Sequence, residues 1–400
     1  MTERLVIVGG GIAGVTTADA LRTGGFDGDI TLVDSGELPY DRPPLSKDFL
    51  AGTKDIRQIA LQPAQWYDDQ RIRLVSQATV IALHAAEGRV ELADGTMLKA
   101  DRVVLATGGG AARPPVPGID GEHVHVLRTA EDADRLRSVL VPGATVLVVG
   151  AGLIGSEVAS TAVRLGCNVA LADPMATPLA STLGPELATW LHELHTWHGI
   201  LTSRAALESS EDHGDHVEVR LTGRRGARSY DAVVVGVGMV PHTALAEQAG
   251  LEVDRGIVVD AGQVTSNPAV LAVGDPARRR GELRVEHWEA ARQDGARAAA
   301  TILGTAPPAP TAPWFWTDRH GQHVEAVGLM ESAAETVVRG SFEDPSFSVF
   351  GLRDGRVVAA ASVDDSTAVR AARRMIDRRI PVDGRRLSDP AVSMRALLRD

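Results

Sequence analysis

Two glycine clusters share one spacing that is suited to binding a dinucleotide. Gly9-Gly10-Gly11-Ile12-Ala13-Gly14 and Gly150-Ala151-Gly152-Leu153-Ile154-Gly155 both follow the pattern Gly-x-Gly-x-x-Gly. In such a turn the first glycine permits a tight bend, the second lets the backbone approach a pyrophosphate, and the third lets a helix pack on a strand. A carboxylate follows each cluster by about 20 residues, at Asp34 and at Asp173, where it can accept both ribose hydroxyls.

The segments around each cluster predict the same βαβ unit twice. A short apolar run at 5–8 enters the first cluster, a helical stretch follows at 15–22, and a second apolar run at 30–34 ends in the acid. The same order recurs at 146–149, 156–165 and 169–173. Two dinucleotide folds imply two dinucleotides, and the usual chemistry of such a pair is hydride exchange between a bound flavin and a diffusing nicotinamide.

Asp173 also predicts which nicotinamide is used. A carboxylate at this position repels the 2′-phosphate of NADP, whereas an arginine would attract it. The residues that follow, 174–177, offer no cation. We therefore expect NADH as the donor.

Composition excludes several other classes of protein. The 400 residues suggest two or three domains, and 44% hydrophobic with 23% charged residues is typical of a globular chain rather than a disordered one. The net charge of −11 argues against nucleic-acid binding. The single cysteine, Cys167, excludes an internal disulfide and a dithiol redox pair. Because no apolar run reaches about 18 residues and a strand begins by residue 5, we expect a cytoplasmic protein without a membrane span or signal peptide.

The remaining chain carries further strand, linker and helix signals. Strands that end in a glycine turn or an acid are predicted at 102–108, 231–236 and 270–275. A proline-rich crossover is predicted at 113–118, and a linker at 305–313. Beyond that linker, 347–350 and 357–360 flank Arg353-Asp354-Gly355 as a hairpin, and an arginine-rich helix is predicted at 368–379.

Taken together, these motifs resemble a known family. The sequence is similar to the FAD-dependent NADH:ferredoxin reductases of bacterial oxygenase and cytochrome P450 electron-transfer chains, which share the glutathione-reductase-like fold with two dinucleotide domains. Besides the two glycine clusters, the motifs that carry the resemblance are Tyr40-Asp41-Arg42-Pro43-Pro44-Leu45-Ser46-Lys47, Ala106-Thr107-Gly108, the segment from Gly150 to Glu157, Val273-Gly274-Asp275, Glu286-His287-Trp288 and Trp314-Phe315-Trp316-Thr317-Asp318. They cover nearly the whole chain, and the first and last of them are more specific than the glycine clusters.

The resemblance implies an α/β fold with two Rossmann-like domains, one inserted in the other, and a C-terminal α/β domain. The FAD domain would comprise 1–108 and 241–308, the NAD domain 109–240, and the C-terminal domain 309–400. The implied activity is that of a ferredoxin--NAD(+) reductase, in which hydride passes from NADH to FAD and electrons then pass singly to a small [2Fe–2S] ferredoxin. The implied assembly is a monomer or a homodimer, without nucleic acid or membrane.

The resemblance also implies a set of site residues. The catalytic candidates are Lys47 beside the flavin, Glu157 reaching towards the nicotinamide, and Trp316 stacking near the flavin ring. Asp294 departs from the family pattern, because glutamine is common at that position. The cofactor-binding candidates are Gly9, Gly11, Ile12, Ala13, Gly14, Asp34, Arg42, Pro44, Lys47, Ala106, Thr107, Gly108, Arg128, Gly150, Gly152, Leu153, Ile154, Gly155, Glu157, Asp173, Gly238, Gly274, Asp275, His287 and Trp288.

Rival functions leave one alternative open. Thiol–disulfide reduction needs a cysteine pair soon after the first turn, and residues 35–52 hold none. A ferredoxin-independent NADH-oxidising or redox-signalling flavoprotein, similar to apoptosis-inducing factor, remains the alternative. For an acidic ferredoxin, Arg278-Arg279-Arg280 and the arginines at 370, 373, 374, 378 and 379 are two candidate docking clusters. His192, His195 and His198 spread too widely around a helix for a tetrahedral site, so we predict no metal.

Overall fold

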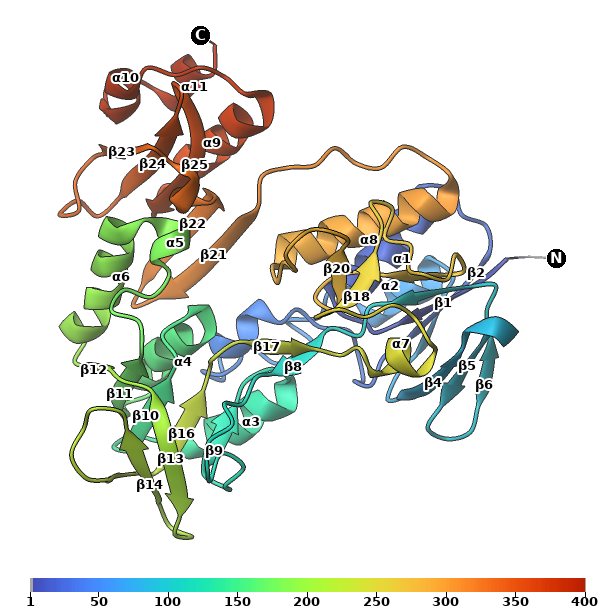
Figure 1. The fold of residues 1–400 in the computed structure, drawn as a ribbon, viewed down its shortest axis with the longest axis horizontal. Coiled ribbons are helices and arrows are strands. Elements are labelled where there is room, and N and C mark those ends of the chain that lie inside the picture. The colour runs from blue at the N-terminus through green and yellow to red at the C-terminus, as the bar shows by residue number, and fades with distance from the viewer. Residues whose placement is uncertain (1–2, 400) are drawn as a thin grey trace. The chain divides into compact units, whose positions relative to one another are not determined.

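The computed structural model describes residues 3–399 and divides the chain into two compact units (Figure 1). The first unit comprises Met1–Pro44, Lys54–Gly110 and Met239–Ala309. The second comprises Leu45–Thr53, Ala111–Gly238 and Pro310–Asp400. The predicted division into three domains stays a prediction.

The first unit is built on a parallel five-stranded sheet in the order β19-β7-β1-β2-β3. These strands are nearly continuous apolar runs because helices cover a parallel sheet on its faces. Its strands are β1 (Arg4–Val8), β2 (Asp29–Val33), β3 (Ile72–Val75), β7 (Arg102–Leu105) and β19 (Val270–Ala272). The smaller sheets contain β4 (Val80–His84), β5 (Arg89–Leu92), β6 (Met97–Lys99), β18 (Ile257–Val259) and β20 (Ala277–Arg279), and β8 (Gly109–Ala111) pairs with β17 (Met239–Pro241).

Helix packing in this unit centres on α1 and α8, which lie side by side (Figure 1). A Cβ atom at Gly295 of α8 would lie 2.5 Å from the carbonyl oxygen of Ala13, so glycine is what allows the two helices to approach this closely. The core beneath them gathers Leu5, Ile7, Ala18 and Leu21. The helices of the unit are α1 (Ile12–Thr23), α2 (Ala64–Asp69), α7 (Ala244–Gln248) and α8 (Trp288–Leu303), with a short 3₁₀ turn η2 (Ala85–Glu87). A second 3₁₀ turn, η1 (Pro43–Ser46), begins in this unit and ends in the next.

The second unit repeats the parallel sheet and adds two antiparallel ones. Its parallel sheet has the order β12-β11-β10-β16-β9, and the antiparallel β13-β14-β15 sheet packs its apolar face on that sheet. The strands are β9 (Val124–Val126), β10 (Thr145–Val149), β11 (Asn168–Asp173), β12 (Leu201–Arg204), β13 (Leu207–Asp212), β14 (Val217–Leu221), β15 (Arg228–Tyr230) and β16 (Ala232–Val235). The helices are α3 (Ala130–Val139), α4 (Leu153–Arg164), α5 (Ala180–Leu183) and α6 (Pro185–Trp197).

The C-terminal part of the second unit is an antiparallel sheet in the order β21-β22-β25-β24-β23, with α9 packed on β25 and β22 (Figure 1). The predicted hairpin is present, with Arg353 paired to Arg356 and Asp354-Gly355 at its tip. The elements are β21 (Trp314–Arg319), β22 (Gln322–Gly328), η3 (Met330–Ser332), β23 (Glu335–Arg339), β24 (Phe347–Arg353), β25 (Arg356–Val363), α9 (Ser366–Arg378), α10 (Gly384–Ser388) and α11 (Met394–Leu397).

The predicted fold class is confirmed by these two parallel sheets and the C-terminal domain. The predicted βαβ segments correspond to β1-α1-β2 and β10-α4-β11, each with a parallel pair of strands. Residues 305–313, predicted as a linker, carry no regular secondary structure. No helix among residues 3–399 has both the length and the apolar character that crossing a membrane requires.

Candidate active site

The first glycine turn is shaped to receive a phosphate group at the start of α1. Gly9 has φ of 110°, and a Cβ there would lie 2.2 Å from the carbonyl oxygen of Ala106. A Cβ at Gly11, in contrast, would meet no atom within 4 Å, so the backbone is open where α1 begins. The Gly10 amide donates to Asp34 Oδ1 at 3.3 Å. Open backbone amides at a helix N-terminus fit the pyrophosphate of a dinucleotide.

The second glycine turn repeats this geometry at the start of α4. A Cβ at Gly150 would lie 2.4 Å from the Gly236 carbonyl oxygen, whereas one at Gly152 would meet nothing within 4 Å. Asp173 ends β11, and its Oδ2 accepts the Ala151 amide at 2.7 Å while Oδ1 accepts the Met175 amide at 2.8 Å. The carboxylate is therefore fixed beside the open turn, where a ribose would lie.

Other predicted flavin-site residues gather around the first turn of the first unit. Gly274 approaches Ala13, since a Cβ on Gly274 would lie 3.0 Å from the Ala13 Cβ. The Arg42 guanidinium lies over Gly108, with its nearest nitrogen 3.1 Å from a Cβ built there. Trp288, the first residue of α8, donates from Nε1 to Asp41 Oδ1 at 2.8 Å. These contacts bring the YDRPP segment, the ATG turn and the start of α8 to one part of this unit.

Two residues that support this region were missed or left unassigned by the sequence analysis. Asp294 of α8 accepts the Gly274 amide at 3.3 Å and the Gln263 side-chain amide at 2.8 Å, so it holds the turn before Asp275. Burial raises the pKa of Asp294, and the nearby guanidinium groups of Arg297 and Arg279 oppose that shift. His242 is joined to Thr107 by two hydrogen bonds, of 2.8 and 3.1 Å. Sequence analysis did not assign Asp294 and His242 to this site because both lie far along the chain from the glycine motif.

A buried carboxylate forms the centre of the second unit's site. Glu157 lies in the first turns of α4 with 4% of its surface exposed. Ser46 Oγ donates to its Oε2 at 2.5 Å, and Thr317 Oγ1 donates to its Oε1 at 2.7 Å. Lys47 Nζ lies 3.3 Å from Oε1. Burial raises the pKa of Glu157, while the Lys47 ammonium and the two hydroxyl donors lower it and so offset part of that rise.

Lys47 bridges Glu157 to a second, more exposed carboxylate. Its Nζ donates to Asp318 Oδ2 at 2.7 Å and lies 5.5 Å from the centre of the Trp316 ring. Burial favours a higher pKa for Asp318, but hydrogen bonds from Lys47 and His323 bring that pKa below its usual value. Two carboxylates therefore fix one ammonium group beside an aromatic face, and the predicted roles of Lys47 and Trp316 stay predictions.

His323 extends this ion-pair chain along β22. Its Nδ1 lies 2.5 Å from Asp318 Oδ1, and its Nε2 lies 3.1 Å from Glu325 Oε1. Glu325 also accepts from Trp314 Nε1 at 3.1 Å and from the Ser366 hydroxyl. Burial opposes protonation of His323, yet its bonds to Asp318 and Glu325 raise its pKa above the usual value. The chain Glu157–Lys47–Asp318–His323–Glu325 thus alternates in charge when His323 is protonated.

A second polar cluster is formed by Arg319 of β21, His195 of α6 and His320, which follows β21. Arg319 is buried, with its Nη2 3.4 Å from Thr317 Oγ1, and burial lowers its pKa to about 10. His195 is fully buried, and its Nδ1 lies 2.9 Å from His320 Nε2. Burial lowers the pKa of His195 to about 2 and that of His320 to about 4. Both histidines are therefore neutral at physiological pH.

Several predicted cofactor residues make structural contacts in the second unit. Leu153 packs against the apolar cluster of the C-terminal sheet, whereas its neighbour Ile154 is 42% exposed. The Arg128 amide donates to Asp132 Oδ2 at 3.0 Å, next to the capping box that starts α3. Gly238 has φ of 117°, and a Cβ there would meet no atom within 4 Å. The cofactor roles of these residues stay predictions.

Comparison with known proteins gives the family. Residues 3–295 match the family described as "Pyridine nucleotide-disulphide oxidoreductase", and residues 314–398 match the family described as "Reductase C-terminal". The chain belongs to the pyridine nucleotide-disulphide oxidoreductases. This membership confirms the family predicted from the motifs, and it implies that the oxidoreductase binds FAD and NAD(H).

Full-length relatives are similar to this oxidoreductase. The anthranilate 1,2-dioxygenase system ferredoxin--NAD(+) reductase component of Burkholderia cepacia is 40% identical, with 99% of each chain covered. Putidaredoxin reductase of Pseudomonas putida is 36% identical, covering 99% of this chain and 97% of the relative. The solved putidaredoxin reductase in its covalent complex with putidaredoxin has a TM-score of 0.92 at 34% identity, covering 99% of this chain and 98% of that one.

The disulphide chemistry in the family's name has no counterpart in this oxidoreductase. Cys167 is a lone buried thiol whose Sγ lies 3.4 Å from the Val141 carbonyl oxygen. Burial raises its pKa, which disfavours the reactive thiolate. The segment where a cysteine pair would stand instead carries Ser46 and Lys47, both of which contact Glu157.

Proposed function

We propose that this oxidoreductase transfers hydride from NADH to FAD and then passes electrons one at a time to a small [2Fe–2S] ferredoxin that serves a Rieske oxygenase or a cytochrome P450 in the cytoplasm. The observation that carries the proposal is the 40% identity to a ferredoxin--NAD(+) reductase component over 99% of both chains, the C-terminal domain included. The site supports it, because each glycine turn is open to one dinucleotide and a paired lysine stands where thiol enzymes need cysteine.

The first unit supplies the residues that would hold FAD. The open amides at the start of α1 would bind the pyrophosphate, and Asp34 would accept the ribose hydroxyls. Arg42, Gly108, Gly274, Asp275 and Trp288 would line the rest of the site. When bound, FAD supplies an acceptor that takes two electrons together and releases them singly.

In the second unit, α4 and Asp173 would hold NADH. Asp173 is fixed by the amides of Ala151 and Met175, so its negative charge cannot turn away from a ribose 2′ position. A 2′-phosphate there would face this carboxylate with no compensating arginine in residues 174–177. Discrimination against NADPH follows from that repulsion.

Lys47 and Glu157 would control the charge at the point of hydride transfer. Glu157 and Asp318 hold the Lys47 ammonium group from two sides, so Lys47 would supply a fixed positive charge that favours negative charge on a bound flavin. Glu157 is itself held by its bonds to Ser46 and Thr317, so its carboxylate keeps the Lys47 ammonium group in place. Trp316 would offer a flat face to the nicotinamide.

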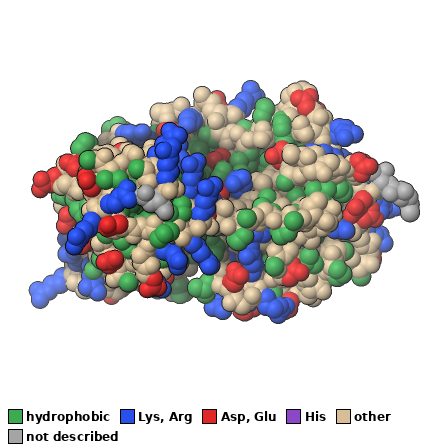
Figure 2. All heavy atoms as spheres, turned by 90° about the horizontal axis from the view of Figure 1, so that it is seen from above, with side chains coloured by type: hydrophobic (Ala, Val, Ile, Leu, Met, Phe, Trp, Pro, Cys, Tyr) green, Lys and Arg blue, Asp and Glu red, His purple; other side chains and the backbone are tan. Residues whose placement is uncertain are grey.

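Of the two arginine clusters, α9 is the better docking surface for an acidic ferredoxin. Arg278 pairs with Asp254 at 2.6 Å and Arg280 with Glu252 at 2.5 Å, so the charge of that run is largely compensated. Within residues 3–399, no ion pair engages the exposed arginines at 370, 374, 378 and 379. Figure 2 shows Lys and Arg side chains gathered over the part of the molecule that contains the C-terminal helices.

Anaerobic stopped-flow spectroscopy of the FAD-loaded protein tests the proposed reaction. NADH should bleach the flavin quickly, NADPH should do so much more slowly, and an oxidised [2Fe–2S] ferredoxin from a bacterial oxygenase system should then restore the absorbance. Bleaching that no such ferredoxin reverses would favour the ferredoxin-independent flavoprotein instead. A preparation that takes up no flavin would overturn the proposal.

Charge reversal tests the docking surface separately. Arg374→Glu together with Arg378→Glu should raise the KM for ferredoxin about tenfold at low salt, and the difference should shrink at high salt because exposed charges are screened. Bleaching by NADH should stay at the original rate. Arg280→Glu is the matched control, since that side chain is already paired with Glu252. A larger effect of the control would assign docking to the 278–280 run.

A further inference from the structure

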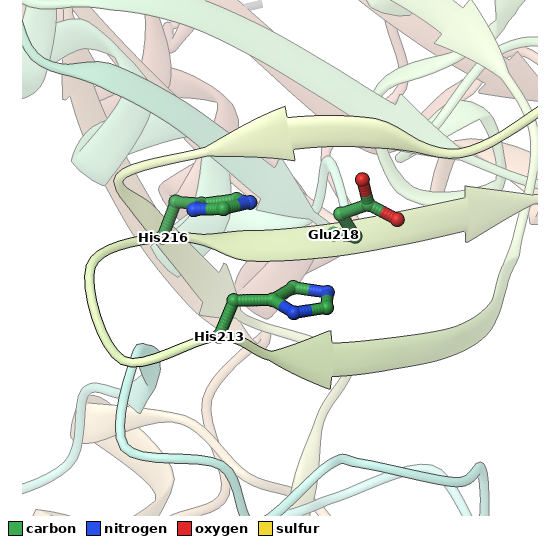
Figure 3. Close-up of side chains that lie close together, drawn as sticks. All are labelled: His213, His216 and Glu218. Atoms are coloured by element: carbon green, nitrogen blue, oxygen red, sulfur yellow. The ribbon is translucent and has the colours of Figure 1, made fainter.

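Three metal-binding side chains meet at the tip of the β13–β14 hairpin (Figure 3). His213, His216 and Glu218 each offer one ligand atom, and these three atoms all lie within 4.8 Å of one another. His213 and His216 come from the turn, while Glu218 lies in β14, the strand that leaves it. None of the three belongs to the redox site proposed above.

The backbone of the hairpin places these side chains on one face. The His213 amide donates to the His216 carbonyl oxygen at 2.9 Å and closes the turn between Asp212 and Val217, which are paired across the strands. Val217 and Val219 point into the core of the second unit. Because successive side chains in a strand alternate, Glu218 points to the opposite, outer face, and His216 lies in the turn just before this strand.

Asp215 prepares His216 to bind a cation. Its Oδ1 lies 2.6 Å from His216 Nδ1, so the neutral imidazole carries its proton on Nδ1. The lone pair of Nε2 is then available to a metal ion. A carboxylate behind a histidine ligand is a recurring arrangement at zinc sites, where it fixes the tautomer and makes the ligand more basic.

The outer face of the hairpin also carries uncompensated negative charge. Glu211 is paired directly opposite Glu218, and like charges in such a position repel each other. Within residues 3–399, neither carboxylate has a basic side chain as an ion-pair partner. A divalent cation bound at Glu218 would remove this repulsion.

We propose that His213, His216 and Glu218 form a binding site for one divalent transition-metal ion of the Zn²⁺ class, with Asp215 as the residue that orients His216. Two imidazoles with one carboxylate favour such an ion over Mg²⁺ or Ca²⁺, which select oxygen ligands. In a tetrahedral Zn²⁺ site two ligand atoms lie about 3.4 Å apart, so a ligand pair at the 4.8 Å limit would have to close by about 1.4 Å. Three protein ligands leave the fourth position open to water or to another molecule.

The sequence analysis predicts no metal because it considers only the histidines of α6. Those side chains are engaged otherwise: His195 Nδ1 contacts His320, and the His198 ring stacks on the His320 ring at 4.2 Å. The hairpin histidines belong to no familiar metal motif in sequence. The turn brings His213 and His216 close together, and only the folded hairpin shows that Glu218 lies on the same face.

Isothermal titration with Zn²⁺ tests the site in the full chain, loaded with FAD and free of any affinity tag. The unchanged protein should bind one equivalent that His213→Gln, His216→Gln and Glu218→Gln each weaken by more than about tenfold. Asp215→Asn should weaken it by about tenfold, in line with the loss of a carboxylate behind a ligand. His84→Gln is the matched control, since His84 forms a similar pair with Glu91 at 3.0 Å on another hairpin.

Thermal unfolding gives a second readout that does not depend on enzyme activity. Zn²⁺ should raise the unfolding midpoint of the unchanged protein and of His84→Gln. The unfolding midpoints of His213→Gln and His216→Gln should be the same with and without Zn²⁺. Equal midpoints without metal show that the variants are folded. Titrations in which the unchanged protein binds no Zn²⁺, or in which the hairpin variants bind it as well as His84→Gln does, would overturn the proposal.

Discussion

Helices α1 and α4 start from the same backbone geometry but differ in the side chains that they present. Both contain 12 residues and follow a turn whose third glycine touches the carbonyl oxygen of the first. A Cβ at Gly14 would lie 2.1 Å from the Gly9 oxygen, and a Cβ at Gly155 would lie 1.9 Å from the Gly150 oxygen. The backbone of the two glycine turns is thus nearly duplicated.

The difference lies two residues beyond the third glycine. That position is Thr16 in α1 and Glu157 in α4. Helix α1 is packed against α8 through Gly295, with no ionisable side chain in its first turn. Helix α4 instead packs on β21 and presents Glu157 to Ser46 and Thr317. The backbone geometry is shared, and the side chain at this position is what distinguishes the two helix starts.

Replacing the third glycine of either turn by alanine should affect one dinucleotide and not the other. Gly155→Ala should weaken the binding of NADH by about 100-fold or more while the flavin stays bound, because a Cβ cannot lie 1.9 Å from an oxygen. Gly14→Ala should abolish flavin binding instead. Flavin absorbance after gel filtration and NADH titration of the oxidised protein measure the two losses. Loss of flavin from Gly155→Ala would show that the turns are not independent.

Removing the charge of Glu157 should separate chemistry from binding. Glu157→Gln keeps an acceptor for Ser46 and Thr317 but takes away one of the two carboxylates that fix Lys47. We expect the rate of flavin bleaching by NADH to fall by about 100-fold, at the scale of a lost preorganised charge. The flavin content and the affinity for NADH of Glu157→Gln should equal those of the unchanged protein.

The control is the corresponding position of α1. Thr16→Val should leave the bleaching rate within about twofold of the original, since Thr16 is outside the charged network. If both variants slowed bleaching equally, the contrast between the helices would be wrong. A rate unchanged in Glu157→Gln would assign this residue a packing role at the helix start.

The sequence predicts the local parts of this comparison and not the long-range ones. Each βαβ unit is a continuous stretch whose periodicity and glycines are visible directly, so both helices and both acids could be found. The partners of Glu157 lie 111 and 160 positions away, at Ser46 and Thr317, and no local pattern couples such segments. Asp294 was noted only as a departure from a family pattern, although it holds the Gly274 turn.

The ribose carboxylates offer a smaller test of the same comparison. Asp173→Ser removes the charge that opposes a 2′-phosphate and loses the ribose acceptor. We expect the KM for NADH to rise about tenfold and the preference for NADH over NADPH to fall by a similar factor, measured by steady-state reduction of ferricyanide. Asp34→Ser should weaken flavin retention and leave the nicotinamide preference unchanged. A changed preference in Asp34→Ser would show that the two acids do not serve separate dinucleotides.

The prediction with the smallest effect at neutral pH concerns the loss of folding stability in acid. We expect a histidine of the second unit, His195, to determine it. His195 is neutral when folded, with its pKa lowered to about 2 by burial, but gains a proton near pH 6.5 when unfolded. The stability that it contributes is therefore present above pH 6.5 and lost as the pH falls towards 2, at about 1.4 kcal/mol per pH unit. His195→Gln should remove that slope between pH 6 and 4.

Urea unfolding at several pH values measures this slope. His84→Gln is the control, because His84 lies in the first unit and its side chain is 37% exposed. The His195 variant should be less stable than the original at pH 7, through the lost contact with His320, and should close that gap as the pH falls. A gap that stays constant with pH would mean that His195 is not the group that titrates. The acid sensitivity would then be assigned to His320, whose pKa is lowered to about 4 in the same cluster.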